Sequence, residues 1–342
     1  YKKILKELKS LINLKIEFRY TAGWSSLVAR QAHNLKVGGS NPSPATKMNI
    51  KNNFPAFPNP KDENKFYIFN NGYFIDPYNK NDKLKILEYS KNTEGWTDEL
   101  TQMFHHHIGA NHPIDIASRE ICINYLKDFN KNKQNVVLEI GCSSGYLINK
   151  IKMKKKYNYI GSDAVKNHIV KLSEKYKDVP FLIFDLLKNP FKKPICDALI
   201  MLNVLEHIKN DDAALLEANK ILNDNGVLII EVPAGKFLYD DYDKKLKHFR
   251  RYNMGEITKK IEKAGFTIER KTHLGFIVYP LFVIVKLFNK LFKDKNIVIK
   301  QVKNSNNFFT KMFFNLEKKL YKINFPFGIR CYICARKLNN SK

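Results

Sequence analysis

An acidic residue followed by a short run of small residues could form a nucleotide-binding turn in the middle of the chain. Residues 136–140 are apolar except for Glu139 and rich in β-branched side chains, which predicts a buried parallel strand. The loop of small residues that follows contains Gly141, Cys142, Ser143 and Gly145. Glycines let a backbone approach a ligand closely, and backbone N–H groups at the start of the next helix can bind it. The stretch therefore predicts a site for a nucleotide-like ligand.

Two common nucleotide-binding motifs do not fit this loop. The dinucleotide fingerprint requires G-x-G-x-x-G, which residues 141–145 do not supply. A phosphate-binding P-loop requires a Lys followed by Ser or Thr, and that pair is absent as well. A nicotinamide-dependent oxidoreductase is therefore disfavoured. An ordinary turn between a strand and a helix remains the structural alternative.

The same loop resembles the first motif of class I S-adenosylmethionine-dependent methyltransferases, E/D-x-G-x-G-x-G. Glu139, Gly141 and Gly145 match this motif, and Ser143 replaces its middle glycine. The resemblance implies that S-adenosylmethionine is the cofactor. It also implies a set of cofactor contacts in this loop: Glu139, Gly141, Cys142, Ser143 and Gly145.

Alternating strands and helices follow the loop and indicate a doubly wound α/β fold. Strands are predicted at residues 157–160, 181–184, 198–202 and 227–232. Short crossovers between buried strands produce a right-handed parallel sheet, which binds ligands at the carboxyl ends of its strands. Asp163, Asp185 and Asn203 each lie at or just past such an end. We therefore expect a Rossmann-like methyltransferase sheet that is mostly parallel, with an antiparallel last strand.

The resemblance assigns roles to these strand ends. It implies that Asp163 accepts hydrogen bonds from the ribose hydroxyls and that Asp185 reads the adenine amino group. A carboxylate suits both roles because it accepts hydrogen bonds without donating any; N-capping of the following helix is the structural alternative for both. Residues 203–207, Asn-Val-Leu-Glu-His, resemble the fourth-strand motif of the ubiquinone-biosynthesis-like branch (methyltransferase type 11/23-like). Asn203 is therefore expected to contact the cofactor.

Three histidines are candidates for catalysis or acceptor binding. A hydroxyl acceptor needs a base, and His207 and His248 are the candidates, although His207 could equally be a hydrogen-bonded structural histidine. His112 ends a histidine-rich turn, residues 105–112, ahead of a predicted helix over 114–129. In the resembled family such a helix covers the pocket, so His112 is expected to bind the acceptor. We expect no metal at this turn, because neighbours in sequence cannot all face one ion.

A His-x-Arg-Arg-Tyr loop after the fifth strand is a further candidate for acceptor binding. It contains Arg250, Arg251 and Tyr252. Arginine rather than lysine suits a planar partner such as a carboxylate or phosphate. The structural alternative is an ion pair with one of the nearby aspartates: Asp240, Asp241 or Asp243.

Five segments are expected along the chain: a non-native extension over 1–47, an irregular N-terminal cap over 48–110, a methyltransferase domain over 111–273, an apolar and basic helical insertion over 274–325, and the last strand and tail over 326–342. Residues 22–46 can be back-translated into a methionine transfer-RNA gene, so we expect the native protein to start at Met48. Short strands are expected in the cap at 66–69 and 73–75.

The predicted insertion combines apolar and basic residues. Its apolar run, 274–285, is shorter than the about 20 residues of a membrane-spanning helix. Lysines beside a strongly apolar face suit an interfacial helix, an acceptor lid or a dimer contact, whereas helices packed on the main domain are the plain alternative. The insertion could therefore make a peripheral contact with a membrane or form a homodimer. A membrane contact would favour a lipid or lipid-linked glycan as acceptor.

The formal net charge of +26 could attract nucleic acid or an anionic membrane. Only eight of the 59 basic residues are arginine, and Lys, Asn and Ile are all abundant, which indicates a solvated lysine-rich surface. The five scattered cysteines fit a reducing cytoplasm, with the inner face of the membrane as a peripheral location. Cys331 and Cys334 form a C-x-x-C inside an alternating strand, whose opposite faces keep the two thiols apart and disfavour a metal or redox site.

Together these patterns predict an S-adenosylmethionine-dependent methyltransferase (EC 2.1.1.-) that acts on a small molecule, a lipid or a glycan, with O-methylation favoured. A nucleic-acid methyltransferase is one alternative. It is disfavoured because the Asn/Asp-Pro-Pro-Tyr motif of amino-group methylases and the Pro-Cys nucleophile of cytosine-5 enzymes are absent. A non-catalytic subunit that keeps the fold is the other alternative.

Overall fold

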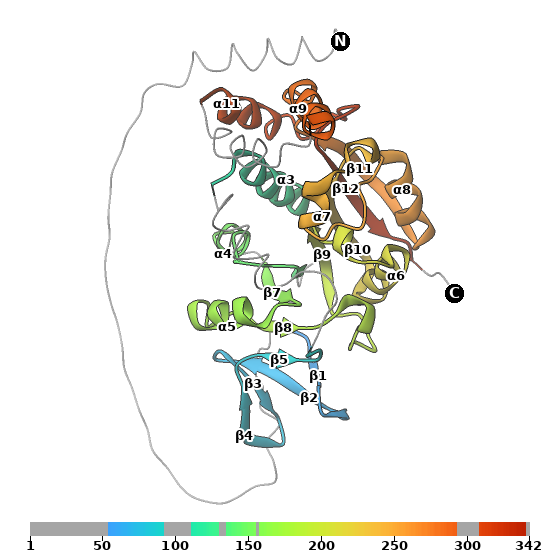
Figure 1. Cartoon of the computed structure of the whole chain (residues 1–342). Coiled ribbons are helices and arrows are strands. Elements are labelled where there is room, and N and C mark those ends of the chain that lie inside the picture. Colours follow the sequence, from blue (N-terminus) through green and yellow to red (C-terminus); the bar gives the residue numbers. More distant parts are fainter. Residues whose placement is uncertain (1–53, 92–110, 130–134, 155–156, 293–307, 340–342) are drawn as a thin grey trace, which may run out of the picture. The chain divides into compact units, whose positions relative to one another are not determined.

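The computed structural model describes residues 54–91, 111–129, 135–154, 157–292 and 308–339 (Figure 1). The chain divides into two compact units, residues 1–50 and 51–342, and every described residue belongs to the second. The expected extension over 1–47 and the histidines at 105–107 therefore lie outside the described residues.

An eight-stranded sheet with the strand order β11-β12-β10-β9-β6-β7-β8-β5 forms the centre of the second unit. Its central parallel strands are β6 (Val136–Ile140), β7 (Asn158–Asp163), β8 (Phe181–Ile183), β9 (Cys196–Leu202) and β10 (Leu222–Pro233). The chain runs outward from β6 through β7 and β8, then returns to place β9 on the other side of β6. Ligands of such sheets bind outside the carboxyl ends of the strands, where the strand order reverses. The predicted Rossmann-like sheet is confirmed.

Two late strands complete the sheet. They are β11 (Phe266–Leu274) and β12 (Arg330–Lys337), and β12 pairs antiparallel with both β10 and β11. The antiparallel last strand predicted from the sequence is therefore confirmed. Cys331 and Cys334 of β12 pack into separate hydrophobic cores, which agrees with their predicted positions on opposite faces.

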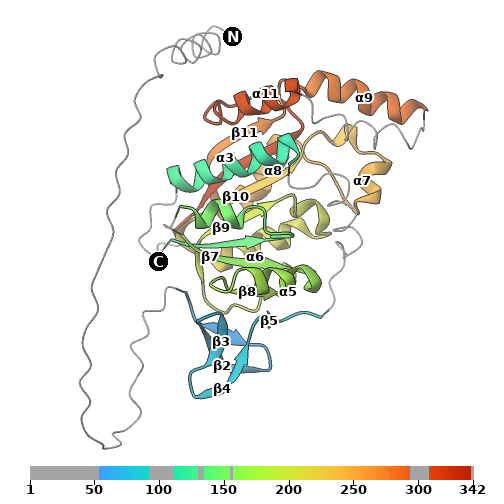
Figure 2. The same cartoon turned by 90° about the vertical axis from the view of Figure 1, so that its left-hand side faces the viewer.

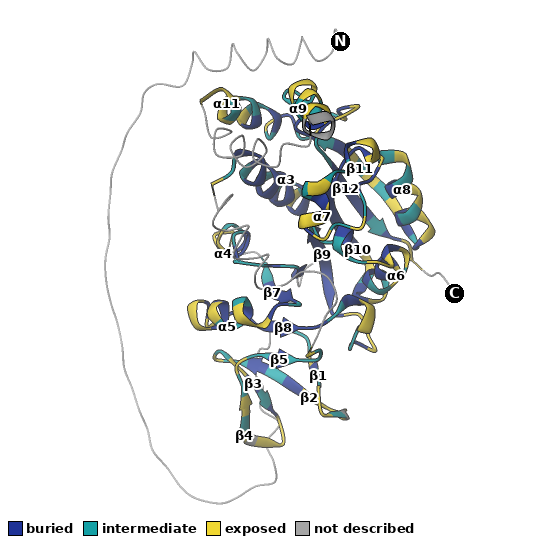
Figure 3. Cartoon of the chain, in the orientation of Figure 1, coloured by how far each residue is buried: buried dark blue, intermediate teal, exposed yellow. Residues whose placement is uncertain are grey.

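Helices cover both faces of this sheet (Figure 2). One face carries α6 (Asp211–Ile221) and α8 (Met254–Lys263). The other face carries α3 (Pro113–Phe129), α4 (Ile148–Lys152), α5 (Lys166–Lys175) and α11 (Phe308–Glu317). Strand β6 serves both cores, because its alternate side chains point in opposite directions: Leu138 packs into the first core and Val137 into the second. Figure 3 shows the resulting concentration of buried residues in the strands and on the inner sides of the helices.

The N-terminal segment is more regular than the sequence indicated. It forms a four-stranded antiparallel sheet of β1 (Phe57–Asn59), β2 (Asp62–Asn70), β3 (Tyr73–Asp76) and β4 (Asn79–Leu84). Phe57, Phe69 and Phe74 pack edge to face and join the first core of the main sheet. The short strand β5 (Leu87–Glu88) then pairs parallel with β8. Aromatic packing stabilises this segment without the long periodic runs that reveal strands in a sequence.

The predicted helical insertion contains α9 (Tyr279–Phe292) as well as α11. Among the described residues, no helix combines the length and the apolar content that crossing a membrane requires.

Candidate functional site

The predicted nucleotide-binding turn connects β6 to α4 at the carboxyl edge of the sheet. Positive φ angles occur at Gly141 (+75°), Ser143 (+47°) and Gly145 (+71°). A Cβ on Gly141 would lie 2.5 Å from Cγ2 of Val204, and one on Gly145 would lie 2.7 Å from Cδ2 of Leu172. Glycine is therefore required at both positions, by the backbone conformation and by the neighbouring side chains of the protein itself.

Asp163 ends β7 and is tied to this turn by a hydrogen bond. Its Oδ2 accepts the backbone N–H of Ser143 at 2.8 Å, and its Oδ1 accepts that of Val165 at 2.9 Å. Burial raises the pKa of the Asp163 carboxyl. A carboxylate offers about four acceptor positions, so Asp163 could accept a ribose hydroxyl in addition to these backbone donors.

Glu139 lies within β6, directly below the turn. Its side chain is buried and accepts a hydrogen bond from the Tyr159 hydroxyl. Burial raises the pKa of the Glu139 carboxyl to about 7. The group can therefore be present in either protonation state near neutral pH.

Asp185 follows β8 and Asn203 follows β9, each at the start of the connection that leaves the strand. Asp185 caps the short 3-10 helix η1 (Leu186–Lys188), because its Oδ1 accepts the backbone N–H of Leu187 at 3.0 Å. This is the capping role that the sequence offered as an alternative. Asn203 has a φ of +55°, and its backbone N–H donates to the carbonyl oxygen of Glu231 at 2.9 Å. Cofactor contact stays a prediction for both residues.

The groups gathered along this edge fit S-adenosylmethionine. The adjacent strands β6, β7 and β8 bring three carboxyl groups to the edge in succession: Glu139, Asp163 and Asp185. Such acceptors match a ligand that carries ribose hydroxyls and amino groups. The turn at 141–145 also lies at the reversal of strand order, where sheets of this type bind ligands.

A second polar cluster lies where β9 ends. The short helix η2 (Leu205–His207) carries Glu206 and His207, and the loop after β10 brings His248 against them. The ring centroids of His207 and His248 are 4.6 Å apart. The backbone N–H of Phe249 donates to the carbonyl oxygen of Glu206 at 2.8 Å and attaches the loop to η2. The structure thus brings together the two histidines that the sequence identified as candidate bases.

Burial decides the protonation of Glu206 and His207. It raises the pKa of the Glu206 carboxyl to about 8 and lowers the pKa of His207 to about 3. Near neutral pH, Glu206 is therefore mostly protonated and His207 uncharged. Among the described residues, Oε2 of Glu206 is buried without a hydrogen-bond partner.

Glu206, His207 and His248 offer ligand atoms within 4.8 Å of one another, a set that could hold a metal ion although the sequence predicted none.

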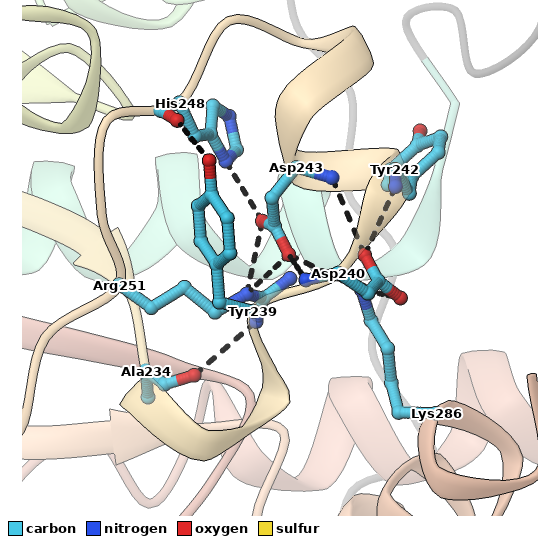
Figure 4. A network of polar contacts seen from close by, with 8 residues as sticks. All are labelled: Ala234, Tyr239, Asp240, Tyr242, Asp243, His248, Arg251 and Lys286. Atoms are coloured by element: carbon cyan, nitrogen blue, oxygen red, sulfur yellow. Dashed lines mark hydrogen bonds and ion pairs between the residues drawn. The ribbon is translucent and has the colours of Figure 1, made fainter. Parts of the chain in front are cut away.

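Asp243, in α7 (Asp241–Lys245), holds His248 on its other side (Figure 4). Oδ1 of Asp243 lies 2.9 Å from Nδ1 of His248, and Nε of Arg251 donates to both carboxylate oxygens. Lys286 of α9 lies 3.5 Å from Oδ2. Burial alone would raise the pKa of Asp243, but the hydrogen bond with His248 and the charges of Arg251 and Lys286 hold it well below its usual range. Arg251 therefore forms the ion pair that the sequence offered as the alternative to acceptor binding.

Arg250 and Tyr252 also have their contacts inside the protein. Arg250 donates to the carbonyl oxygens of residues 208 and 209, at 3.1 and 2.6 Å, and lies 3.1 Å from Oδ2 of Asp211. The hydroxyl of the fully buried Tyr252 donates to the same oxygen at 3.0 Å. These contacts favour a structural role, and acceptor binding by either residue stays a prediction.

A buried ion-pair network at the same edge was not identified from the sequence. Arg330 of β12 lies 3.0 Å from Oε1 of Glu231 and 2.7 Å from Oδ1 of Asp115. Ser118 of α3 donates its hydroxyl to Oε2 of Glu231 at 2.6 Å. His112 lies half-buried just ahead of α3, where burial lowers its pKa. One signal could have pointed to Arg330: it is an arginine in a chain whose basic residues are mostly lysine.

Known proteins similar to this chain include methyltransferases. A family model described as a methyltransferase domain matches residues 116–271. A probable S-adenosylmethionine-dependent methyltransferase of Mycolicibacterium smegmatis is 27% identical over 135 residues, which cover 39% of this chain and 52% of that protein. A ubiquinone biosynthesis O-methyltransferase of Rickettsia prowazekii is 23% identical over 264 residues, which cover 76% of this chain and 92% of that protein.

Solved structures of similar shape include an N-methyltransferase, NodS, of Bradyrhizobium japonicum in complex with S-adenosyl-L-homocysteine. The similarity covers 71% of this chain and 100% of that chain, at 12% sequence identity and a TM-score of 0.43.

Proposed function

We propose that the protein, whose residues 116–271 match a methyltransferase-domain family model, uses S-adenosylmethionine to methylate a hydroxyl group of a small-molecule, lipid or glycan acceptor, with His248 as the general base. The similarity to an O-methyltransferase over most of the chain supports oxygen as the methylated atom. The proposed cofactor contacts are those predicted from the sequence: Glu139, Gly141, Cys142, Ser143, Gly145, Asp163, Asp185 and Asn203.

The hydrogen bond between His248 and Asp243 carries this proposal. A neutral imidazole has one N–H donor and one acceptor nitrogen, and a carboxylate can only accept. With Nδ1 located 2.9 Å from Oδ1 of Asp243, the proton of His248 belongs on Nδ1. Nε2 is then the acceptor nitrogen, which is the arrangement of a general base oriented by a carboxylate.

The surrounding charges keep a carboxylate ionised beside His248. Asp243 stays ionised because His248, Arg251 and Lys286 keep its pKa low against the effect of burial. The neighbouring His207 is uncharged near neutral pH. Burial keeps most of Glu206 protonated, so this carboxyl does not compete as a second base.

When bound, the cofactor supplies a methyl group already activated by a sulfonium. The protein therefore mainly has to align the acceptor and exclude water. We expect the carboxyl groups at the ends of β6 and β7 to hold the ribose side of the cofactor. The loop carrying His248 is attached to η2 through Glu206, which keeps the base at the end of β9.

The test measures methyl transfer from labelled S-adenosylmethionine to a panel of catechols, phenols and total bacterial lipid extract. His248→Ala should lower kcat by about 10²- to 10⁴-fold while the affinity for S-adenosylhomocysteine stays unchanged. Asp243→Asn should act in the same direction, because an amide no longer fixes the proton on Nδ1. His273→Asn, in β11, is the matched histidine control. Wild-type kcat in His248→Ala would remove His248 as the base.

A further inference from the structure

α9 and α11 lie at the same end of the main sheet (Figures 1 and 2). Both helices expose large apolar side chains. On α9 these are Leu281, Ile284, Leu287 and Phe288; on α11 they are Phe308, Phe309 and Met312. Ile284 is 64% exposed and Phe308 74%. The residues on α9 recur at helical spacing and so form one stripe. Gathered apolar surface of this kind marks a contact with a partner or a membrane.

The exposed stripes belong to helices that are firmly attached on their other sides. Glu317 of α11 accepts the backbone N–H groups of Gly275 and Ile277, at 2.6 and 2.8 Å, just ahead of α9. The hydroxyl of Tyr321, after α11, donates to Asp128 of α3 at 2.8 Å. These hydrogen bonds fix both helices on the rest of the fold. Their exposed apolar side chains therefore belong to ordered helices.

Lys286 attaches α9 from the side opposite its apolar stripe. Its Nζ lies 2.8 Å from Oδ2 of Asp240 and 3.5 Å from Oδ2 of Asp243 (Figure 4). Asp243 in turn contacts His248. One helix thus joins the exposed apolar surface to the loop that carries the proposed base.

The charge of residues 274–325 indicates which partner binds the exposed apolar side chains of α9 and α11. Residues 274–325 contain ten lysines and only two acidic residues, Asp294 and Glu317, and Glu317 is buried. Lys311 and Lys319 are exposed in and just after α11. A second copy would bring Lys311 and Lys319 close to the same exposed lysines of its partner, and these charges would repel one another. A bilayer with anionic headgroups attracts both the apolar side chains and the lysines. Each lysine near such a surface contributes about 1 kcal/mol to the binding free energy.

We infer that α9 and α11 form a docking surface for a lipid bilayer that contains anionic lipid. Their apolar side chains enter the boundary between headgroups and acyl chains, and the lysines around them contact the headgroups. Through Lys286, the docked helix places the His248 loop next to the bilayer, where an acceptor dissolved in lipid can reach it.

Cosedimentation of the full chain with vesicles tests this surface. Vesicles of phosphatidylcholine with phosphatidylglycerol should bind the protein, binding should increase with the phosphatidylglycerol fraction, and salt should weaken it. The double variant Leu281→Glu/Ile284→Glu should lower the affinity by at least about tenfold, because it places carboxylates where acyl chains are expected. Leu216→Glu, at a half-exposed leucine of α6, is the matched control and should bind as the wild type does.

Three results would overturn the inference. The first two are equal binding of the double variant and the wild type to anionic vesicles, and no binding by either. The third is a wild-type dimer by light scattering that the double variant turns into a monomer, which would assign the surface to a second copy. Calorimetric binding of S-adenosylhomocysteine verifies the fold of each variant. Since no turnover is measured, the outcome does not depend on the proposed methyl transfer.

Discussion

Arg330 of β12 lies 3.0 Å from Glu231 of β10, and this buried ion pair joins two antiparallel strands that are adjacent in the sheet but far apart in the chain. Burial opposes the charge of Arg330, yet Glu231 and Asp115 raise its pKa above the usual value. The side chain of Glu231 also accepts hydrogen bonds from Ser118 and Asn203. The pair therefore connects α3, the end of β9 and the last strand at the edge where the cofactor is expected.

Removal of Arg330 should destabilise the protein strongly. In Arg330→Met, Glu231 and Asp115 lose their buried cation, and the free energy of unfolding should fall by about 3–5 kcal/mol. Denaturant titration measures this change. The double variant Arg330→Met/Glu231→Gln should be less destabilised than the sum of the two single variants. Lys244→Ala, which removes an exposed pair with Asp241, should leave stability nearly unchanged because solvent screens that pair. A loss below 1 kcal/mol in Arg330→Met would contradict the assigned role.

An alanine at position 141 should strain the cofactor turn. The φ of +75° disfavours any side chain, at a cost of about 1–3 kcal/mol, and the new Cβ would also overlap Val204. Val204→Ala should relieve the overlap, so the double variant should lose less stability than the two single losses combined. Gly255→Ala, in α8, is the control, because a Cβ there has no neighbour within 4 Å. That substitution should be neutral or stabilise by up to about 1 kcal/mol. Equal losses at both glycines would disprove the explanation.

Asp163→Asn should weaken cofactor binding. An amide has one acceptor oxygen and so cannot replace a carboxylate that accepts backbone N–H groups and, as we propose, the ribose hydroxyls; such charged hydrogen bonds contribute about 1.5–3 kcal/mol. Calorimetry should therefore show an affinity for S-adenosylhomocysteine lowered by roughly 10- to 100-fold. Asp178→Asn, at an exposed carboxylate ahead of β8, should bind normally. Unchanged affinity in a folded Asp163→Asn protein would remove Asp163 from the cofactor site.

Glu206 should make stability fall as pH rises. Its folded pKa is about 8, whereas the unperturbed value is 4.5. Between these values the folded protein keeps a proton that the unfolded chain has released, so the free energy of unfolding decreases with pH across this window. Glu206→Gln stays neutral, and its stability relative to the wild type should therefore increase from pH 5.5 to 8 and then level off.

Thermal unfolding of wild type and Glu206→Gln at several pH values measures this difference. The low pKa of His207 acts below pH 6.5 in both proteins and cancels in the comparison. Glu174→Gln, at an exposed glutamate of α5, should give a curve parallel to that of the wild type. A parallel curve for Glu206→Gln as well would show that burial does not perturb this carboxyl.

The parts of the fold that could be predicted are those encoded by short, local sequence patterns. The turn at 141–145 and the strands that end near Asp163 and Asn203 are encoded by short runs of apolar and small residues, and these strands occur as expected. In the N-terminal sheet such runs occur only at 66–69 and 73–75, where the strands predicted from the sequence lie within β2 and β3. The stability of this sheet comes from contacts among Phe57, Phe69 and Phe74, which are separated in sequence and become neighbours only when the strands pair.

By itself, the sequence determined the parallel sheet, the glycine-rich turn and the acidic residues at the strand ends, because strand periodicity and turn chemistry are local. Only the tertiary structure decided which polar groups meet. It placed Asp243 against His248, turned Arg251 inward and brought Arg330 to Glu231. Burial likewise set the protonation of Glu206, since the cost of a charge depends on how much protein surrounds it and not on its neighbours in sequence.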